Sequence, residues 1–171
     1  MRLTALLLAL GAYLCCTGEP RADQAGRALH ALCGPRGDAI ADLVRAEAHR
    51  FLIHPALLAS VIALESRCDP NAVGARGEIG LGQLMPRGAA ATSPLLGRAF
   101  SRRELRDPAT NVYVTARFIA WNLTACQKGP EHALTGYNQR HGCKPSRYAR
   151  RVLGLLKMAQ REGQPKRKDR S

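Results

Sequence analysis

One glutamate at the end of an apolar run is the residue in this chain best placed for acid chemistry. Glu65 follows residues 56–64, in which Leu, Val and Ile recur at steps of three and four. This spacing predicts a helix that carries the glutamate on its buried face. Burial and the negative end of the helix dipole both disfavour a carboxylate, so the pKa of Glu65 should be raised. A carboxyl protonated near neutral pH can act as general acid at a glycosidic bond. The alternative is a glutamate that simply reaches solvent from a helix end.

A glycine-rich loop follows this acid. Glycines stand at positions 74, 77, 80 and 82, and the segment closes on Gln83-Leu84-Met85-Pro86. Glycine permits turns that other residues resist, and without a side chain the backbone amides can approach a saccharide. We therefore expect this loop to flank a cleft that has Glu65 at its edge.

Helices must position these residues. Proline at 55 suits a first helical turn, and the Asp69-Pro70 step should end that helix. Asp38 is expected to cap the preceding helix, Asp107 with Pro108 a later one, and Ser146 the last. A short helix over 131–138 and a short helix with a loop over 87–106 complete the set. In the helix after Asp107, we expect Asn111 to be a structural amide and Trp121 to lie in the core, with a sugar-stacking role for Trp121 as the alternative.

The order of these motifs resembles the signature of the lysozyme-like domain of soluble lytic transglycosylases, over roughly residues 40–156. The matching residues are Glu65-Ser66, Asp69-Pro70, Ala72-Val73, Gly77, Gly80-Leu81, Gln83-Leu84-Met85-Pro86, Asp107-Pro108, Asn111-Val112, Tyr137-Asn138, and Tyr148 with Arg151-Val152-Leu153. The resemblance implies a mainly α, lysozyme-like transglycosylase domain that needs no cofactor or metal.

The resemblance also implies a reaction and a set of roles. In that family one glutamate, here Glu65, protonates the glycosidic oxygen between N-acetylmuramic acid and N-acetylglucosamine. It then takes the proton of the muramyl C6 hydroxyl, which closes a 1,6-anhydro ring. Tyr137 should lie beside the acid. The substrate-binding residues implied are Ser66, Gly80, Gln83, Met85, Tyr137 and Asn138.

Three positions in the loop depart from the family pattern. Gly74 stands where many members have serine, Gly82 where methionine is usual, and Glu78 where a small residue is common. Glu78 is a candidate second carboxylate, so a hydrolytic muramidase is an alternative function, although a solvent-facing loop charge is the simpler interpretation. A non-catalytic protein that binds the cell wall or assists its assembly is the other alternative.

The chain divides into four parts. Residues 1–18, with Arg2 before a leucine-rich run, resemble a secretory signal peptide whose end lies between 16 and 25. Cys15 and Cys16 raise a lipoprotein alternative. Residues 19–37 are expected to be a linker or loose lead-in, 38–159 the lysozyme-like domain, and 160–171 a basic disordered tail. The protein should therefore be exported to the periplasm or cell envelope, or outside the cell, without a membrane span after signal removal.

Four cysteines remain after signal removal, which points to two disulfides in an oxidising compartment. Three pairings are open, and we favour Cys33 with Cys68 and Cys126 with Cys143, because each would tie a helix end to a neighbouring loop. Zinc binding is the competing interpretation, with histidines at 30, 49, 54, 132 and 141. The cysteines form no close pair at metal-ligand spacing, which disfavours zinc.

The charge indicates an anionic partner. The formal net charge is +13, and aromatic residues make up 5% of the chain. A basic exported protein will concentrate on the anionic bacterial wall. The sequence lacks the basic motifs interleaved with aromatic residues that stack on bases, so we expect no nucleic-acid partner. The expected partners are peptidoglycan glycan strands and cell-envelope machinery, bound by a monomer.

Overall fold

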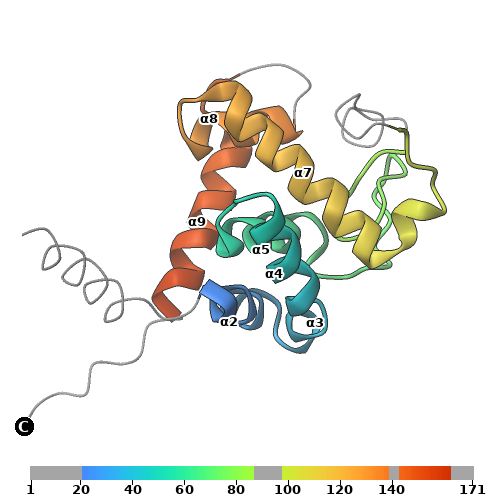
Figure 1. Ribbon diagram of the computed structural model, residues 1–171, viewed down its shortest axis with the longest axis horizontal. Coiled ribbons are helices and arrows are strands. Elements are labelled where there is room, and N and C mark those ends of the chain that lie inside the picture. The colour runs from blue at the N-terminus through green and yellow to red at the C-terminus, as the bar shows by residue number, and fades with distance from the viewer. Residues whose placement is uncertain (1–20, 87–97, 139–142, 163–171) are drawn as a thin grey trace, which may run out of the picture.

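The computed structural model describes residues 21–86, 98–138 and 143–162, and helices dominate these ranges (Figure 1). They are α2 (Arg21–Cys33), α3 (Pro35–Asp38), α4 (Ala41–Arg50), α5 (Pro55–Ser66), the 3-10 turn η2 (Glu104–Arg106), α7 (Pro108–Cys126), α8 (Pro130–Asn138) and α9 (Arg147–Glu162). Extended backbone pairs only at two isolated bridges within the described residues. The mainly α class expected from the sequence is confirmed.

Helix α5 is the central element, because α2, α4 and α9 all pack against it. Every residue from Pro55 to Ile62 is buried, so α5 is covered on all sides and not along one stripe. Its first turn is closed by His54, whose Nδ1 accepts the amide N–H of Ala56 at 3.2 Å. The helix ends at Ser66, earlier than the expected Asp69-Pro70 step, because Arg67 has a left-handed backbone with φ of 54°.

The linker expected over residues 19–37 is wrong, because helix α2 occupies most of this range. Ala25, Ala28 and Leu29 are at most 2% exposed, and α2 packs against both α5 and α9. Their spacing of three and four places them on one face of a helix, and this outweighs the glycines that suggested a loop. The expected capping role of Asp38 is also wrong. Asp38 ends α3 and pairs with His30 Nδ1 at 3.0 Å, while α4 begins at Ala41.

Helix α7 begins as the sequence predicted. The Asp107 side chain accepts the amide N–H of Thr110 at 2.8 Å, and Pro108 occupies the first turn. Trp121 does not lie in the core as expected: it is 43% exposed and stacks on Phe118, with ring centroids 5.7 Å apart. The face of α7 that packs in the core carries Val112, Ala116 and Ile119, and Trp121 lies outside that face at the surface.

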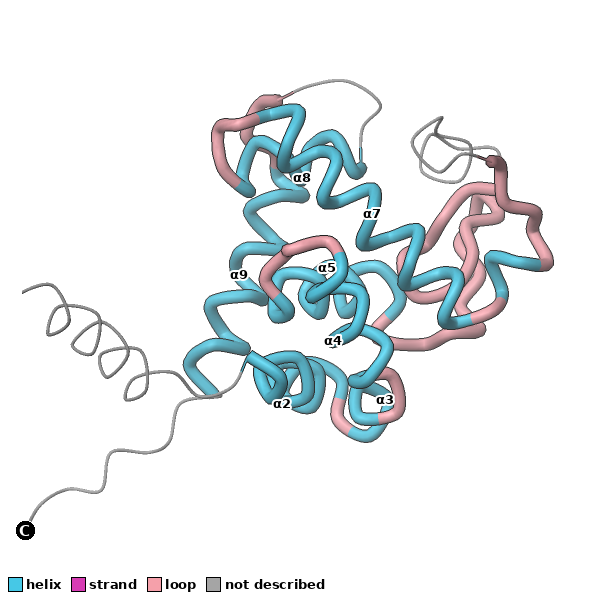
Figure 2. The backbone as a smooth tube through the Cα atoms, viewed as in Figure 1, coloured by secondary structure: helices cyan, strands magenta, loops and turns pink. Residues whose placement is uncertain are grey.

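The segment between α5 and α7 forms a lobe of loops beside the helices (Figure 2). It has its own small apolar cluster, made of Ile79, Leu84, Phe100 and Leu105 packed on Val114 of α7. The glycine-rich loop is thereby anchored to α7. The predicted short helix within 87–106 falls partly on residues 87–97, which lie outside the described residues.

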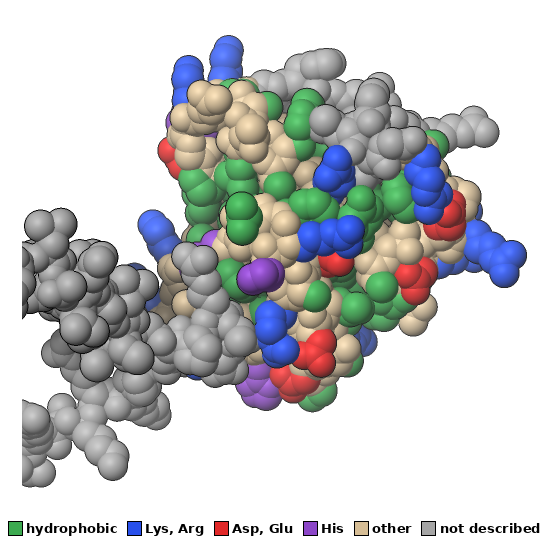
Figure 3. Space-filling view, viewed as in Figure 1, with side chains coloured by type: hydrophobic (Ala, Val, Ile, Leu, Met, Phe, Trp, Pro, Cys, Tyr) green, Lys and Arg blue, Asp and Glu red, His purple; other side chains and the backbone are tan. Residues whose placement is uncertain are grey.

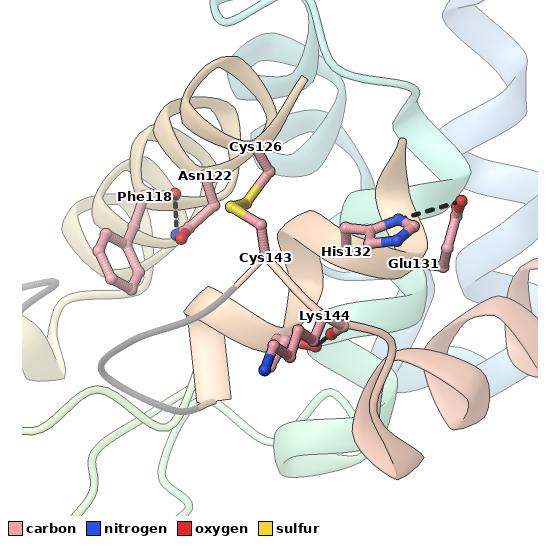
Figure 4. Close-up of a disulfide and its surroundings, with 8 residues drawn as sticks. Phe118, Asn122, Cys126, Glu131, His132, Cys143 and Lys144 are labelled. Carbon is pink, nitrogen blue, oxygen red and sulfur yellow. Dashed lines mark hydrogen bonds and ion pairs between the residues drawn. A yellow bond between two sulfur atoms is a disulfide. The ribbon is translucent and has the colours of Figure 1, made fainter. Parts of the chain in front are cut away.

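Two disulfides hold the helix ends in the favoured pairing. Cys33 bonds to Cys68, which joins α2 to the loop after α5, and Cys126 bonds to Cys143, which joins α7 to the segment before α9 (Figure 4). The Thr135 hydroxyl donates to the Lys144 carbonyl and so holds that segment to α8. Both disulfides therefore fix the elements that flank Glu65.

The predicted chain ends lie largely outside the described residues. Residues 1–20, with the signal peptide and its two cysteines, and residues 163–171 of the expected tail are not described, and these predictions stand untested. Residues 160–162 belong to α9, so the predicted disordered tail began too early. Among the described residues, no helix has both the length and the apolar character needed to cross a membrane.

Candidate active site

Glu65 occupies the last turn of α5, where α9 covers it. Its side chain is partly buried, and the Tyr148 hydroxyl donates a hydrogen bond of 2.6 Å to Glu65 Oε1. Burial raises the pKa of Glu65 above its ordinary value, and the nearby Glu78 charge adds to this rise. The Tyr148 hydrogen bond and the Arg151 charge oppose the rise without cancelling it. The carboxyl therefore keeps its proton to a higher pH than a surface glutamate does, as the sequence predicted.

Two stacked tyrosines line the position of this carboxyl. The rings of Tyr137 and Tyr148 lie 6.3 Å apart between centroids at an interplanar angle of 13°. Burial, and then the neighbouring Glu65, raise the pKa of both phenols, so both remain neutral hydrogen-bond donors. Tyr137 donates to the Gly82 carbonyl oxygen at 2.7 Å and so connects α8 to the glycine-rich loop.

Tyr148 is the residue that sequence reasoning missed. The expectation placed Tyr137 beside Glu65, but the phenol bonded to the carboxyl is Tyr148, with Tyr137 stacked behind it. The available signal was its place in the last motif, where Tyr148 precedes Arg151 by one helical turn. That spacing brings both residues to the Glu65 side of α9.

Asn111 holds the glycine-rich loop against α7 through hydrogen bonds, as expected of a structural amide. Its Nδ2 donates to the carbonyl oxygens of Ile79 and Leu105 at 2.9 and 2.8 Å, and its Oδ1 accepts the amide N–H of Gly82 at 2.8 Å. A methyl group at Gly80 would lie 2.5 Å from Asn111 Nδ2. Gly80 is therefore required for this close packing, and it is buried; its substrate-binding role stays a prediction.

The substrate-binding role of Ser66 stays a prediction. Ser66 is buried, and its hydroxyl donates to the Ile62 carbonyl oxygen of its own helix at 3.2 Å. Asn138 ends α8 with an exposed side chain. Thus, of the predicted site residues, the structure places Tyr137 behind the Tyr148–Glu65 pair and leaves Asn138 open to solvent, while Ser66 faces its own backbone.

Gln83 and Met85 lie in the last turn of the glycine-rich loop. Gln83 Nε2 donates to the carbonyl oxygens of Gly80 and Ala72, at 2.9 and 3.3 Å. Met85 is 38% exposed and lines a pocket of about 490 Å³ together with Pro86, Ser101 and Arg102. Glu65 is not among the residues that line this pocket.

Glu78 is the second carboxylate of this region. Its oxygens accept the backbone N–H of Arg76 at 2.9 Å and Arg76 Nε at 2.8 Å. Hydrogen bonds from backbone amides, its own first, and from the Arg76 side chain lower the pKa of Glu78 despite its partial burial. Glu78 is therefore ionised under conditions in which Glu65 still carries a proton.

The described residues offer no metal centre. All four cysteines of the zinc hypothesis are consumed in disulfides. Within the ranges that the structure describes, His, Cys, Asp and Glu form no group of three or more that could hold a metal ion. His141 lies outside those ranges.

Comparison with known proteins gives one family. The family model for the transglycosylase SLT domain matches residues 42–151, which is more than half of the chain and includes Glu65, the glycine-rich loop and both tyrosines. No curated protein matches the chain. The matched region runs from α4 into α9, the same elements that surround Glu65. The chain therefore belongs to the transglycosylase SLT domain family.

Proposed function

We propose that this protein is a peptidoglycan lytic transglycosylase that cleaves the β-1,4 bond between N-acetylmuramic acid and N-acetylglucosamine, with a 1,6-anhydromuramyl product. Membership of the SLT family indicates lytic transglycosylase-type activity in general. The observation that carries the specific proposal is the state of Glu65, a partly buried carboxyl with a raised pKa at the end of the core helix α5. Such a group is suited to donate a proton to a glycosidic oxygen.

The proposed reaction uses Glu65 twice. Its proton passes to the glycosidic oxygen, the C1–O4 bond breaks, and N-acetylglucosamine leaves with a free 4-hydroxyl group. The Glu65 carboxylate then accepts the proton of the muramyl C6 hydroxyl as O6 bonds to C1, and the acid is restored. No water is consumed. Tyr148, bonded to Glu65 Oε1, stabilises the carboxylate between these steps.

A hydrolytic muramidase remains the second candidate, because Glu78 supplies a second carboxylate near the acid. Its charge acts on Glu65. An inverting hydrolase needs such a base to activate water. Against this function, both Glu78 oxygens are already bonded to Arg76, and the pKa of Glu78 is lowered, which makes it a weak base.

A digest of intact sacculi tests the proposal. Mass spectrometry should find anhydromuropeptides from the native protein, and mainly reducing ends would show a hydrolase instead. Glu65→Gln should abolish both products while sacculus pull-down is retained, because the amide cannot donate a proton as an acid does. Glu131→Gln, a 44% exposed glutamate on α8, is the matched control and should digest normally. Retained digestion by Glu65→Gln would reject the proposed acid, and sacculus binding without turnover by the native protein would favour a wall-binding protein.

The proposed partners are peptidoglycan glycan strands at the cell envelope, reached by export, with envelope machinery as a further candidate. The net charge of +13 favours any anionic wall polymer. On the face shown in Figure 3, Lys and Arg side chains of the described residues are spread over several elements and do not form one continuous groove. This distribution suits diffuse attraction to the wall more than tracking along a nucleic-acid backbone.

A further inference from the structure

The outer face of helix α9 is dominated by positive charge. Most of its exposed residues recur at steps of three and four along the helix, which places them on one face. The opposite face carries Ala149, Val152 and Ala159, which are at most 3% exposed and belong to the core. We call the exposed set the α9 basic face; it comprises Arg147, Arg150, Arg151, Gly154, Lys157, Met158 and Arg161.

No carboxylate offsets this charge along the helix. Between residues 144 and 161 the sequence contains six Lys and Arg residues and neither Asp nor Glu. Among the side chains that the structure describes, none of these six cations forms a salt bridge. By contrast, Arg45, Arg76 and Arg98 on other segments each lie within 2.8 Å of a carboxylate oxygen. The α9 basic face therefore directs its charge outward.

The middle of this face is open. A Cβ atom built on Gly154 would meet no described atom within 4 Å. Glycine within a helix is unfavourable relative to alanine, and packing gives no reason for it at this position. Its missing side chain allows an external surface to approach the helix between Arg150 and Lys157. Beside it, Met158 is 41% exposed, so an apolar side chain accompanies the cations.

The shape of the face favours a flat partner. The described elements that pack on α9 are α2, α5 and α8, and they leave the α9 basic face exposed. The face is thus the convex outside of a helix and not a groove between walls. A single flexible polymer would lose conformational freedom on such a face with few contacts in return. A plane of anionic headgroups meets all the cations at once and needs no such ordering.

We propose that the α9 basic face binds the surface of a membrane that contains anionic phospholipids. The helix lies on the headgroups and does not insert, because its apolar side is already buried in the protein core. Each Lys or Arg near such a surface strengthens binding about fivefold. The sequence after α9 adds four more cations, at positions 166, 167, 168 and 170. This attachment is separate from the proposed reaction and does not depend on it.

Binding of the full chain to vesicles tests the proposal. Vesicles of phosphatidylcholine mixed with phosphatidylglycerol are compared with vesicles of phosphatidylcholine alone, and the bound fraction is measured by sedimentation. The native protein should bind the mixed vesicles more tightly, and added salt should release it, because salt screens exposed charges. The apolar run at residues 3–14 is common to all variants, so their differences do not arise from it. Equal binding to the two kinds of vesicle would overturn the proposal.

Removal of three charges from α9 should have a large effect. The triple variant Arg150→Gln/Lys157→Gln/Arg161→Gln should bind the mixed vesicles about 100-fold more weakly, since each charge contributes about fivefold. Arg151 stays in place because its charge acts on Glu65. Thermal unfolding shows whether the variant retains the fold.

A matched triple variant separates this face from net charge alone. Arg103→Gln/Arg106→Gln/Lys128→Gln removes the same charge from exposed positions outside α9. It should weaken vesicle binding much less than the α9 triple variant does. Equal losses in the two triple variants would show that only the net charge matters, and the proposal would be wrong.

Gly154 gives a test that removes no cation. Gly154→Glu places a negative charge in the middle of the face and should weaken binding to the mixed vesicles about fivefold. Gly154→Ala is its control and should leave binding unchanged. Position 154 is open, and both new residues favour a helix more than glycine does, so neither variant should lower Tm. Unchanged vesicle binding by Gly154→Glu would overturn the proposal.

Sacculi distinguish the membrane from the wall as the partner. The α9 triple variant should bind and digest sacculi nearly as the native protein does, because Glu65, Tyr137 and Tyr148 are unchanged. A loss of sacculus binding as large as the loss of vesicle binding would show that the face binds an anionic wall polymer, which overturns the proposal. Failure of the proposed function appears differently, as unchanged digestion by Glu65→Gln with vesicle binding intact.

Discussion

Glu65 and Glu78 belong to two regions of the molecule that treat the same side chain in opposite ways. Glu65 lies in the last turn of a helix whose residues 55–62 are all buried, and among the described residues the Tyr148 phenol is the donor bonded to it; burial raises the pKa of Glu65. Glu78 lies in a loop where backbone amides and Arg76 surround its oxygens, and these donors lower its pKa. The comparison shows that burial of one carboxyl and N–H donors around the other, and not the residue type, divide the two into an acid and a fixed anion.

The largest expected effect comes from moving the acid without removing it. Glu65→Asp withdraws the carboxyl by one methylene group from Tyr148 and from the substrate. A displacement of this size costs about 100-fold in turnover. Release of soluble muropeptides from sacculi measures it. Glu78→Asp, the same change at the anion, should cost much less, and equal losses would show that the two carboxyls share the chemistry.

Tyr148→Phe should have the next largest effect. The phenol stabilises the Glu65 carboxylate, so its loss raises the pKa of Glu65 further and weakens the intermediate state. We expect turnover to fall about tenfold and the alkaline limb of the pH–rate profile to move to higher pH. Tyr113→Phe, on a tyrosine that packs against Phe51 and Phe100, is the control. An alkaline limb that moves downward would contradict the assignment.

Glu78→Gln should move the alkaline limb of the pH–rate profile to lower pH. The Glu78 charge raises the pKa of Glu65, so an uncharged residue lets that pKa fall, and Glu65 loses its proton at lower pH. Arg151→Gln removes a charge that lowers the pKa of Glu65, and it should shift the limb slightly upward. The pH dependence of kcat/KM measures both shifts. Shifts of the same sign would show that these charges do not act through Glu65.

The smallest effect concerns stability. The folded-state pKa of Glu65 is raised, so its contribution favours the fold below the unfolded pKa and is lost as pH rises through the folded value. The folded-state pKa of Glu78 is lowered, so its contribution is present above the unfolded pKa and is lost as pH falls. Near neutral pH, Glu65→Gln should therefore raise Tm and Glu78→Gln should lower it. Both differences in Tm should vanish in acid, below the unfolded-state pKa of glutamate. Thermal unfolding of each variant near neutral pH and in acid checks this.

Local signals in the sequence predicted helices well where the capping residues and the spacing agreed. Pro55 and the apolar run after it predicted α5, and Asp107 with Pro108 predicted the start of α7. The failures occurred where signals conflicted. Before Asp38, glycines and prolines suggested a linker, but Ala25, Ala28 and Leu29 have helical spacing and find a buried surface on α5 and α9. Only packing could decide between these signals.

The candidate site was predictable in part. The position of Glu65 and the rise in its pKa followed from a helix end and an apolar neighbourhood. The opposite behaviour of Glu78 did not, because it depends on the turn that brings Arg76 onto its oxygens. The contacts of Ser66 with its own helix and of Gly80 with Asn111 were not predictable for a similar reason, and the substrate-binding roles expected of these two residues stay predictions.

The sequence by itself determined a mainly helical chain with an acid at a helix end, because helix boundaries and apolar spacing depend on residues within a few turns of each other. The tertiary structure alone decided which groups meet that acid. Tyr148 reaches Glu65 from 83 residues away, and Gly74 admits Glu78 and Gln83 to one point. Contacts of this kind arise from how α9 packs on α5 and how the loop folds on α7, which no local pattern specifies.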